Sequence, residues 1–319
     1  MKVINGLRHL RRQSKGSVVT IGVFDGVHAG HRKIIKEAVA AAKKTGLTSV
    51  VITFDPHPSR VLKPGYHAPS LISLRHREKL IEELGPEILL VAKFTKAFSK
   101  MPPGEFIRKI LAGKLRMRRM CVGENFSFGR GAGGGAGILR RLARMYGYKV
   151  AFVKPVKIGG RIVSSSLIRK LTLEGRLADA ARLLGRPVSV LGTVVKGSGI
   201  ARGLGCPTAN INPHHEVIPP RGVYAVTARF VREARRAQSN KGKFRGILNI
   251  GFRPTFYSSR DEEPTVEVHL FGFKGDLYGR DIEVYFIKKI RDEVKFRSGD
   301  ALVEQIKRDM AAAQKCFTK

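Results

Sequence analysis

The stretch TIGVFDGVHAGHRKII, residues 20–35, joins a run of β-branched and small residues to a basic amphipathic segment. The first part is typical of a buried strand and the second of a helix. Gly22 and Gly26 allow the backbone to turn sharply between the two parts. His28 and His31 are therefore predicted at a helix N-terminus, where free N–H groups and the helix dipole attract phosphate.

Strand-like and helix-like segments alternate on both sides of this stretch. The strand-like segments are residues 17–23, 48–54, 87–94, 118–123 and 148–155. The helix-like segments are residues 31–45, 73–85, 103–113 and 137–147. Such alternation predicts βαβ units, a parallel sheet and a Rossmann-like α/β fold. Residues 164–186, which begin with serines able to cap a helix, are predicted to form one or two helices.

The pattern changes after residues 185–187. Five short β-branched segments follow, separated by Gly, Pro and Asn, at residues 188–197, 222–231, 244–251, 265–273 and 281–290. This spacing predicts an antiparallel β-barrel. A helix is expected at residues 298–317. We place a domain boundary near Gly185, which gives an α/β domain at 1–185 and a barrel domain with a terminal helix at 186–319.

The charge of the chain is strongly positive, with 60 basic and 25 acidic residues and a formal net charge of +35. Residues 1–190 carry 37 basic and 11 acidic side chains, so most of the excess lies in the first half. Such a field favours anionic partners, either nucleic acid or phosphorylated small molecules. The sequence lacks a helix-turn-helix, zinc-finger or RNA-recognition signature, so we expect no specific nucleic-acid partner.

Other compositional features favour a cytoplasmic protein without a membrane partner. We expect the chain to be a monomer or a weak homo-oligomer. No apolar run approaches the roughly 18 residues that a membrane span requires. The basic N-terminal segment lacks the apolar region of a secretory signal. Cys121, Cys206 and Cys316 are too few and too scattered for a disulfide framework or a zinc site.

Two alternative motifs are weak. The glycine run GRGAGG, residues 129–134, matches a dinucleotide-binding pattern, but no acidic residue for the ribose occurs between Glu124 and Glu174. The histidine pair could instead bind a metal, or cap and pack the helix. No HExxH motif or obvious third ligand accompanies the pair, which argues against a metal.

The residues around the histidines resemble the GxFDGxHxGH signature of the HxGH nucleotidyltransferases. TFDPHP (53–58), VGENFSFG (122–129) and VSSSLIR (163–169) resemble one branch of that family, the FMN adenylyltransferase module of bacterial FAD synthetase. In that module a Thr usually stands where this chain has Ser166, which keeps the hydroxyl. An acidic residue is common where this chain has Gly135.

The second half resembles the riboflavin kinases. GLGCPTANI (203–211) is similar to their PTAN motif, and four further segments follow in the family's order: GVYAV (222–226), NIGFRPTF (249–256), VEVHLF (266–271) and DLYGRDIEVYFIKKIRDEVKF (276–296). The chain departs from the family at Cys206, where Phe is usual, and at Ala201 in the glycine-rich loop. Both modules occur together in bifunctional riboflavin kinase/FAD synthetase.

This resemblance implies two reactions. Riboflavin would be phosphorylated by ATP to FMN, the intermediate, and the FMN phosphate would attack the α-phosphorus of a second ATP to release pyrophosphate and form FAD. In the kinase, Glu267 would act as the base, while Thr208 and Asn210 would hold Mg²⁺ against the ATP phosphates. From spacing alone, PTAN is a turn and Glu267 an exposed strand carboxylate.

In the adenylyltransferase, the resemblance assigns His28 and His31 to stabilising the charge that develops on the phosphates. The residues that would bind the nucleotide or its phosphates in the two modules are Gly22, Phe24, Asp25, Gly26, Asn125, Arg161, Ser164, Ser165, Arg169, Gly197 and Arg202.

Two other functions fit part of the sequence. An HxGH transferase acting on another acceptor, such as phosphopantetheine, leaves residues 191–319 unexplained. A basic nucleic-acid-binding protein with a degenerate enzyme fold would be retained on heparin at physiological salt. The intact residues His28, His31, Asn210 and Glu267 argue against degeneracy.

Overall fold

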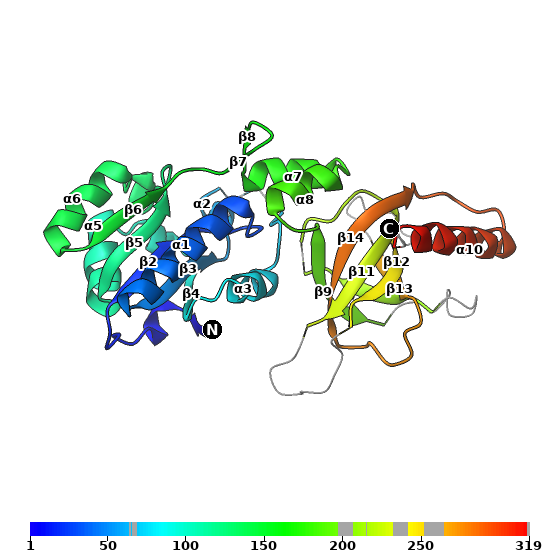
Figure 1. Ribbon diagram of the computed structural model, residues 1–319, viewed down its shortest axis with the longest axis horizontal. Helices are drawn as coiled ribbons and strands as arrows, with labels where there is room; N and C mark the ends of the chain where they lie inside the picture. Colours follow the sequence, from blue (N-terminus) through cyan, green and yellow to red (C-terminus); the bar gives the residue numbers. More distant parts are fainter. Residues whose placement is uncertain are drawn as a thin grey trace. The chain divides into compact units, whose positions relative to one another are not determined.

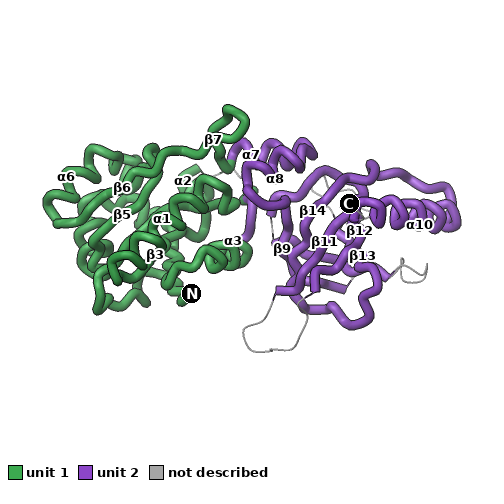
Figure 2. The backbone as a smooth tube through the Cα atoms, viewed as in Figure 1, with its two compact units in different colours: residues 1–70, 74–165 green, residues 71–73, 166–319 purple. Residues whose placement is uncertain are grey.

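The structure, a computed structural model, describes residues 1–63, 65, 69–196, 207–214, 216–231, 242–251 and 265–317. The chain forms two compact units, residues 1–70 with 74–165 and residues 71–73 with 166–319 (Figure 2). The second unit therefore begins ahead of the boundary predicted near Gly185. Each unit has its own buried apolar residues.

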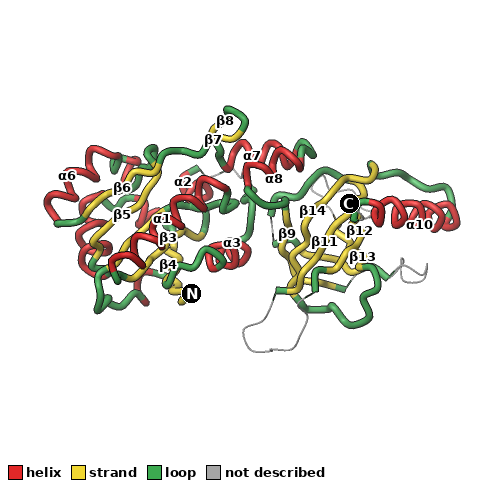
Figure 3. The backbone as a smooth tube through the Cα atoms, in the orientation of Figure 1, coloured by secondary structure: helices red, strands yellow, loops and turns green. Residues whose placement is uncertain are grey.

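The first unit is built on a six-stranded parallel sheet in the order β1-β4-β3-β2-β5-β6 (Figure 3). The strands are β1 (Lys2–Asn5), β2 (Ser17–Ile21), β3 (Thr48–Asp55), β4 (Ile88–Lys93), β5 (Met117–Gly123) and β6 (Lys149–Val153). Five of them lie where the sequence predicts strands. The short strand β1 was not predicted.

Both faces of this sheet are covered, which explains why β2 is buried along its whole length. Val18 packs with Ala38 and Ala42 of α1 on one face. Val19 and Ile21 join the larger core on the other face. Because both faces are covered, this strand does not show the alternation of apolar and polar residues that is typical of a strand with one exposed face.

The predicted helices of the first unit are present with shifted ends (Figure 1). Its α-helices are α1 (Ala29–Thr45), α2 (Pro58–Leu62), α3 (Leu74–Glu82), α4 (Lys96–Ser99), α5 (Pro103–Phe106) and α6 (Ala136–Tyr146). The segment predicted at 103–113 divides into α5 and the π-helix η2 (Ile107–Lys114). The remaining elements are η1 (Leu7–His9), η3 (Arg130–Ala132), β7 (Lys157–Ile158) and β8 (Arg161–Ile162).

The second unit contains a closed six-stranded antiparallel barrel in the order β10-β13-β12-β11-β14-β9. Its strands are β9 (Ser189–Val195), β10 (Ala209–Asn212), β11 (Gly222–Phe230), β12 (Phe244–Gly251), β13 (Thr265–Leu270) and β14 (Asp281–Arg291). Helix α10 (Gly299–Lys315) contacts β11 and β12. The barrel and terminal helix are confirmed, with one strand, β10, more than the five predicted.

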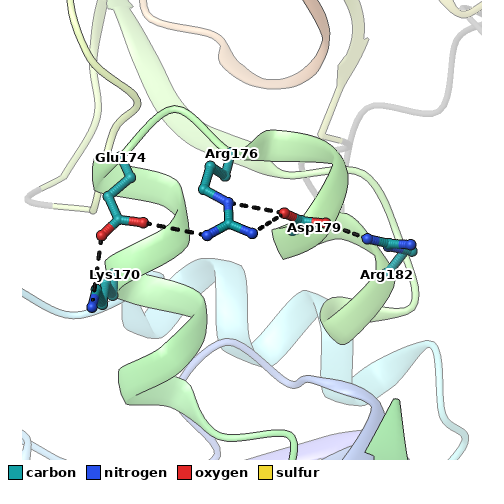
Figure 4. Close-up of polar contacts among 5 residues, drawn as sticks. All are labelled: Lys170, Glu174, Arg176, Asp179 and Arg182. Atoms are coloured by element: carbon teal, nitrogen blue, oxygen red, sulfur yellow. Dashed lines mark hydrogen bonds and ion pairs between the residues drawn. The ribbon is translucent and has the colours of Figure 1, made fainter. Parts of the chain in front are cut away.

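Two helices, α7 (Ser165–Leu173) and α8 (Leu177–Leu184), precede the barrel. A chain of ion pairs joins them (Figure 4): Glu174 contacts Lys170 at 3.8 Å and Arg176 at 3.9 Å, and Asp179 pairs with Arg176 at 2.6 Å and with Arg182. Hydrogen bonds from Arg182 and Arg176 lower the pKa of the Asp179 carboxyl. The pairs are solvent-exposed, so they orient the helices more than they stabilise the fold.

Among the described residues, no helix is both long and apolar enough to cross a membrane.

Candidate functional site

The loop between β2 and α1 has an unusual backbone. Phe24 and Val27 have positive φ angles of 53° and 39°, although neither is glycine, and Gly26 has φ of 83°. A side chain at Gly22 would approach the Phe24 ring to 2.9 Å. Asp25 is buried within the loop. Residues 24–27 therefore form a tight, strained turn just after the carboxyl end of β2.

His28 and His31 meet at the start of α1. His28 is the N-cap residue, and its Nδ1 accepts a hydrogen bond of 3.3 Å from the backbone N–H of His31. The two imidazoles stack with ring centroids 3.6 Å apart. The predicted position of both histidines at a helix N-terminus is confirmed. The capping hydrogen bond uses only one of their ring nitrogens, Nδ1 of His28.

The environment of His31 keeps its ring neutral. Burial lowers its pKa well below the ordinary histidine value, and the nearby His28 and Arg77 lower it further. The Phe24 ring packs edge-on against it at 5.3 Å between centroids. Its buried Nδ1 atom has no hydrogen-bond partner among the described residues. Most buried side-chain nitrogens have a hydrogen-bond partner, so this atom is an exception in the described part of the chain.

Arg77 of α3 braces the same loop from inside the first unit. Its side chain is almost fully buried, at 2% exposure. Its Nη1 atom donates hydrogen bonds to the Val23 carbonyl at 3.1 Å, the Thr53 hydroxyl at 3.0 Å and the Phe54 carbonyl at 3.0 Å. Asp25 and Asp55 are the acidic residues that raise its pKa most, against the larger lowering by burial. One guanidinium thus connects the ends of β2 and β3.

A cavity of about 580 Å³ opens beside this loop. Three of the motifs noted in the sequence reach it, since Gly22, Pro58 and Asn125 are among its lining residues. Its walls are mainly aromatic and come from Phe54, Phe94, Phe98, Phe106, Phe126 and Phe128. Neighbouring rings contact one another with centroids 5.5 to 6.1 Å apart. The aromatic lining suits a flat apolar ligand.

The glycine run at residues 129–134 shapes one wall of the cavity. A Cβ atom at Gly129 would approach Pro103 to 2.7 Å, and one at Gly134 would approach the Phe128 ring to 2.5 Å. Close packing against Pro103 at Gly129 and against Phe128 at Gly134 therefore accounts for these two glycines.

The remaining predicted residues of the adenylyltransferase lie on three elements. Ser165, the first residue of α7, donates a hydrogen bond of 2.8 Å to the Asp25 carbonyl, and Ser164 precedes it. Arg161 lies exposed on β8. Asn125 follows β5 and lines the cavity, whereas Arg169 lies on α7 within the second unit. Ser165 and Asn125 are thereby brought to the histidine loop.

In the second unit, Glu267 and Asn210 occupy directly opposed positions. Asn210 of β10 pairs with Glu267 of β13, and Asn249 of β12 pairs with Glu267 from the other side. Val266 and Val268 are fully buried, so Glu267 faces away from the barrel interior and is half-buried. Paired residues on one face lie about 5 Å apart at Cβ.

Thr208 lies two residues before Asn210, at the edge of a cavity of about 400 Å³. The His269 ring contacts the Pro207 carbonyl through Nδ1 at 2.8 Å and so holds the chain just before Thr208. The predicted residues Gly197 and Arg202, and the family departures at Ala201 and Cys206, lie outside the described residues.

Three features of these sites were not identified from the sequence: Arg77, the aromatic cavity and His269. Arg77 lies in a segment rich in charged residues, which is typical of a solvent-exposed helix. The six phenylalanines are scattered over residues 54–128. The aromatic residues in the NFSFG motif were the available signal for the cavity.

Comparison with known proteins agrees with both halves of the chain. A family model described as FAD synthetase matches residues 10–167, and one described as riboflavin kinase matches residues 184–317. The bifunctional riboflavin kinase/FMN adenylyltransferase of Buchnera aphidicola subsp. Schizaphis graminum is 37% identical over 99% of this chain and 99% of its own length. That of Bacillus subtilis is 36% identical over 97% and 95%.

Among solved structures, one described as a macrolide-efflux protein from Streptococcus pneumoniae has a TM-score of 0.82 and 31% identity, and the match covers 98% of this chain and 99% of that one. The predicted fold, the family and the two activities are confirmed by the family models and the full-length relatives. This chain belongs to the bifunctional riboflavin kinase/FMN adenylyltransferases, which phosphorylate riboflavin to FMN with ATP and adenylylate FMN to FAD.

Proposed function

We propose that the loop between β2 and α1 is the adenylylation site, with His28 and His31 acting on the ATP phosphates. The stacked imidazole pair at a helix N-terminus carries this assignment. Because Nδ1 of His28 accepts a hydrogen bond, its neutral ring carries the proton on Nε2 and can donate it to a phosphate oxygen. His31 would donate as a neutral ring, and the free N–H groups of the first turn would add further contacts.

The remaining residues would hold the triphosphate in line with the attacking FMN phosphate. Asn125 and Ser164 would contact it directly, while Arg161 and Arg169 would neutralise its charge. Gly22, Phe24, Asp25 and Gly26 would shape the loop. The Ser165 hydroxyl would hold the loop through its hydrogen bond to the Asp25 carbonyl. An FMN phosphate oxygen attacks the α-phosphorus, the bond to the bridging oxygen breaks, and pyrophosphate leaves.

The aromatic cavity would hold the flavin ring of FMN. The isoalloxazine system is flat, and its faces match the phenylalanine rings around the cavity. Asn125 and Gly22 line the same cavity at the loop, so the ribityl phosphate would extend toward His28 and His31.

In the barrel, Glu267 would accept the proton of the riboflavin 5′-hydroxyl as its oxygen attacks the γ-phosphorus of ATP and ADP leaves. The donor set fits Mg²⁺, because the Thr208 hydroxyl and the Asn210 amide offer hard neutral oxygens beside the Glu267 carboxylate. When bound, Mg²⁺ would neutralise phosphate charge. Gly197 and Arg202 would bind the same nucleotide.

The two site assignments can be tested separately by measuring the two reactions of the full-length protein. Reactions that start from riboflavin or from FMN, each with ATP and Mg²⁺, are resolved by chromatography into riboflavin, FMN and FAD. A substitution at one site should then alter one conversion and leave the other unchanged. We place this chemistry in the cytoplasm, where ATP is available, in a monomer or weak homo-oligomer.

Arg77→Met is expected to slow FAD formation and change its pH profile. The substitution removes three hydrogen bonds from the ends of β2 and β3 and a positive charge near His31. Because that charge lowers the His31 pKa, its loss raises the pKa, and the acid limb of kcat/KM should move to higher pH. We expect about a tenfold or greater loss of rate, because small misplacements are costly.

Arg77→Lys is the matched control, since it keeps the charge but loses the planar fork. Arg77→Lys should form FAD more slowly, but the acid limb of its kcat/KM profile should lie at the same pH as in the parent enzyme. The other charges near this group, His28, Asp25, Asp55 and Glu78, are unchanged in both variants. An identical acid limb in Arg77→Met would show that Arg77 has only a structural role.

Residues 186–319 are expected to fold alone and convert riboflavin to FMN, never to FAD. The barrel is closed and carries its own buried residues, so it does not need the first unit for a core. A second fragment, 166–319, adds the helices α7 and α8. Kinase activity and melting temperature are measured for both fragments. If only the longer fragment is soluble and active, the boundary near Gly185 is wrong.

A further inference from the structure

The first unit carries most of the excess positive charge of the chain, and part of that charge is concentrated at one place. Three segments, 11–16, 43–48 and 114–118, contain eight lysine or arginine residues and no acidic residue. We call these residues the amino-edge cluster: Arg11, Arg12, Lys15, Lys43, Lys44, Lys114, Arg116 and Arg118.

Backbone contacts hold the three segments together. The Gln13 N–H donates to the Lys114 carbonyl at 2.9 Å, and the Thr48 N–H donates to the Gly16 carbonyl at 3.0 Å. A Cβ atom at Gly16 would lie 2.9 Å from the Arg118 side chain. The segments immediately precede or begin the parallel strands β2, β3 and β5, so the cluster lies at the amino edge of the sheet.

Local structure accounts for only half of these cations. Lys43 and Lys44 complement the C-terminal end of α1. Lys114 and Arg116 donate to the Leu7 and Ser14 carbonyls. The other four members are exposed: Arg11, Arg12, Lys15 and Arg118. Within the described part of the chain, none of these four has a carboxylate within 4.0 Å.

The cluster is separate from the substrate sites of the first unit. His28 follows the carboxyl end of β2 and Asn125 the carboxyl end of β5, whereas the cluster lies at the opposite ends of these strands. The apolar residues within the three segments, Leu47, Leu115 and Met117, are buried or half-buried. An interfacial membrane-binding surface would present apolar side chains beside its cations.

We propose that the amino-edge cluster binds the phosphate backbone of nucleic acid without regard to sequence. Unpaired arginines and lysines on one surface neutralise successive phosphates and release condensed counterions. Arginine is suited to bidentate contact with phosphate. The chain would then associate with RNA or DNA through the cluster while its catalytic edge stays open to substrates.

The test uses the full-length protein and a random-sequence 20-base-pair duplex, with binding measured by fluorescence anisotropy between 50 and 200 mM salt. A cluster variant carries Arg11→Gln, Arg12→Gln, Lys15→Gln and Arg118→Gln. A control variant carries Lys243→Gln, Lys274→Gln, Lys288→Gln and Lys307→Gln, four exposed residues of the second unit. Each variant changes the net charge from +35 to +31.

We expect the cluster variant to bind more weakly and to lose about 3 to 4 units of the slope of log affinity against log salt, because each phosphate contact contributes about 0.9. The control should stay close to the parent protein, and all three should make FMN and FAD at equal rates. Equal weakening in both variants would overturn the proposal, because binding would then follow net charge alone. Absence of binding at 50 mM salt would also overturn it. So would tighter, cluster-dependent binding to phosphatidylserine vesicles, which would identify a membrane surface instead.

Discussion

Glu267→Gln should reduce riboflavin phosphorylation by about 10²–10⁴-fold, the usual range for a lost general base. The substitution is nearly isosteric, and Glu267 faces away from the interior that Val266 and Val268 fill. The barrel should therefore keep its melting temperature. FMN supplied directly should still become FAD, because adenylylation belongs to the other unit. The rate of FMN formation from riboflavin is the measurement.

Glu304→Gln provides a matched control, because it removes an exposed carboxylate from the same unit at α10. Its kinase rate should remain within twofold of the parent enzyme. If Glu267→Gln phosphorylates riboflavin as fast as this control, then Glu267 is an ordinary strand carboxylate and the kinase uses another base.

His28→Ala and His31→Ala should each block FAD formation, by about 10²-fold or more, while FMN accumulates from riboflavin. Removal of one positioned group that stabilises charge in the transition state has this typical cost. His28→Ala also removes the side-chain cap of α1, which costs about 1 kcal/mol of stability. His28→Asn restores a capping side chain and separates the two effects, because it should recover stability without restoring adenylylation.

His9→Ala is the control for these two substitutions, since His9 is an exposed histidine of the same unit whose ring contacts the Asn5 carbonyl. It should leave both conversions unchanged. Normal adenylylation by both His28→Ala and His31→Ala would show that the two histidines are not needed for the reaction. Other groups near the aromatic cavity would then have to bind the ATP phosphates.

Fold elements with strong local signals were predictable, and those formed through distant partners were not. The buried runs of β2, β3 and β4 stand out because both faces of the sheet are covered. β1 has only four residues, three of them exposed, and it exists through its pairing with β4, more than 80 residues away. Strand β10 overlaps the PTAN motif, whose Pro and Asn favour a turn. The pairing of β10 with β9 and β13 overrides this local preference.

The histidine pair was predictable because one short segment contains the strand end, the glycines and both imidazoles. Arg77 was not, because its partners come from other elements and two of the three, at Val23 and Phe54, are backbone carbonyls. Every residue has a backbone carbonyl, so the residue types do not indicate which carbonyls accept a hydrogen bond from Arg77. The pairing of Asn210 with Glu267 likewise depends on the register of two strands that lie far apart in the chain.

Closure of the barrel has a cost during synthesis. Its first strand, β9, completes the cylinder by pairing with its last, β14, and the paired positions are separated by 88 residues at Thr193 and Asp281 and by 96 at Ser189 and Tyr285. At about 5–20 residues per second, a ribosome needs roughly 4 to 20 s to traverse that interval. Throughout it, one flank of β9 offers unsatisfied amide and carbonyl groups to any neighbouring strand. The nascent kinase is therefore open to mispairing until β14 emerges, and a chaperone that shields β9 would act in that interval.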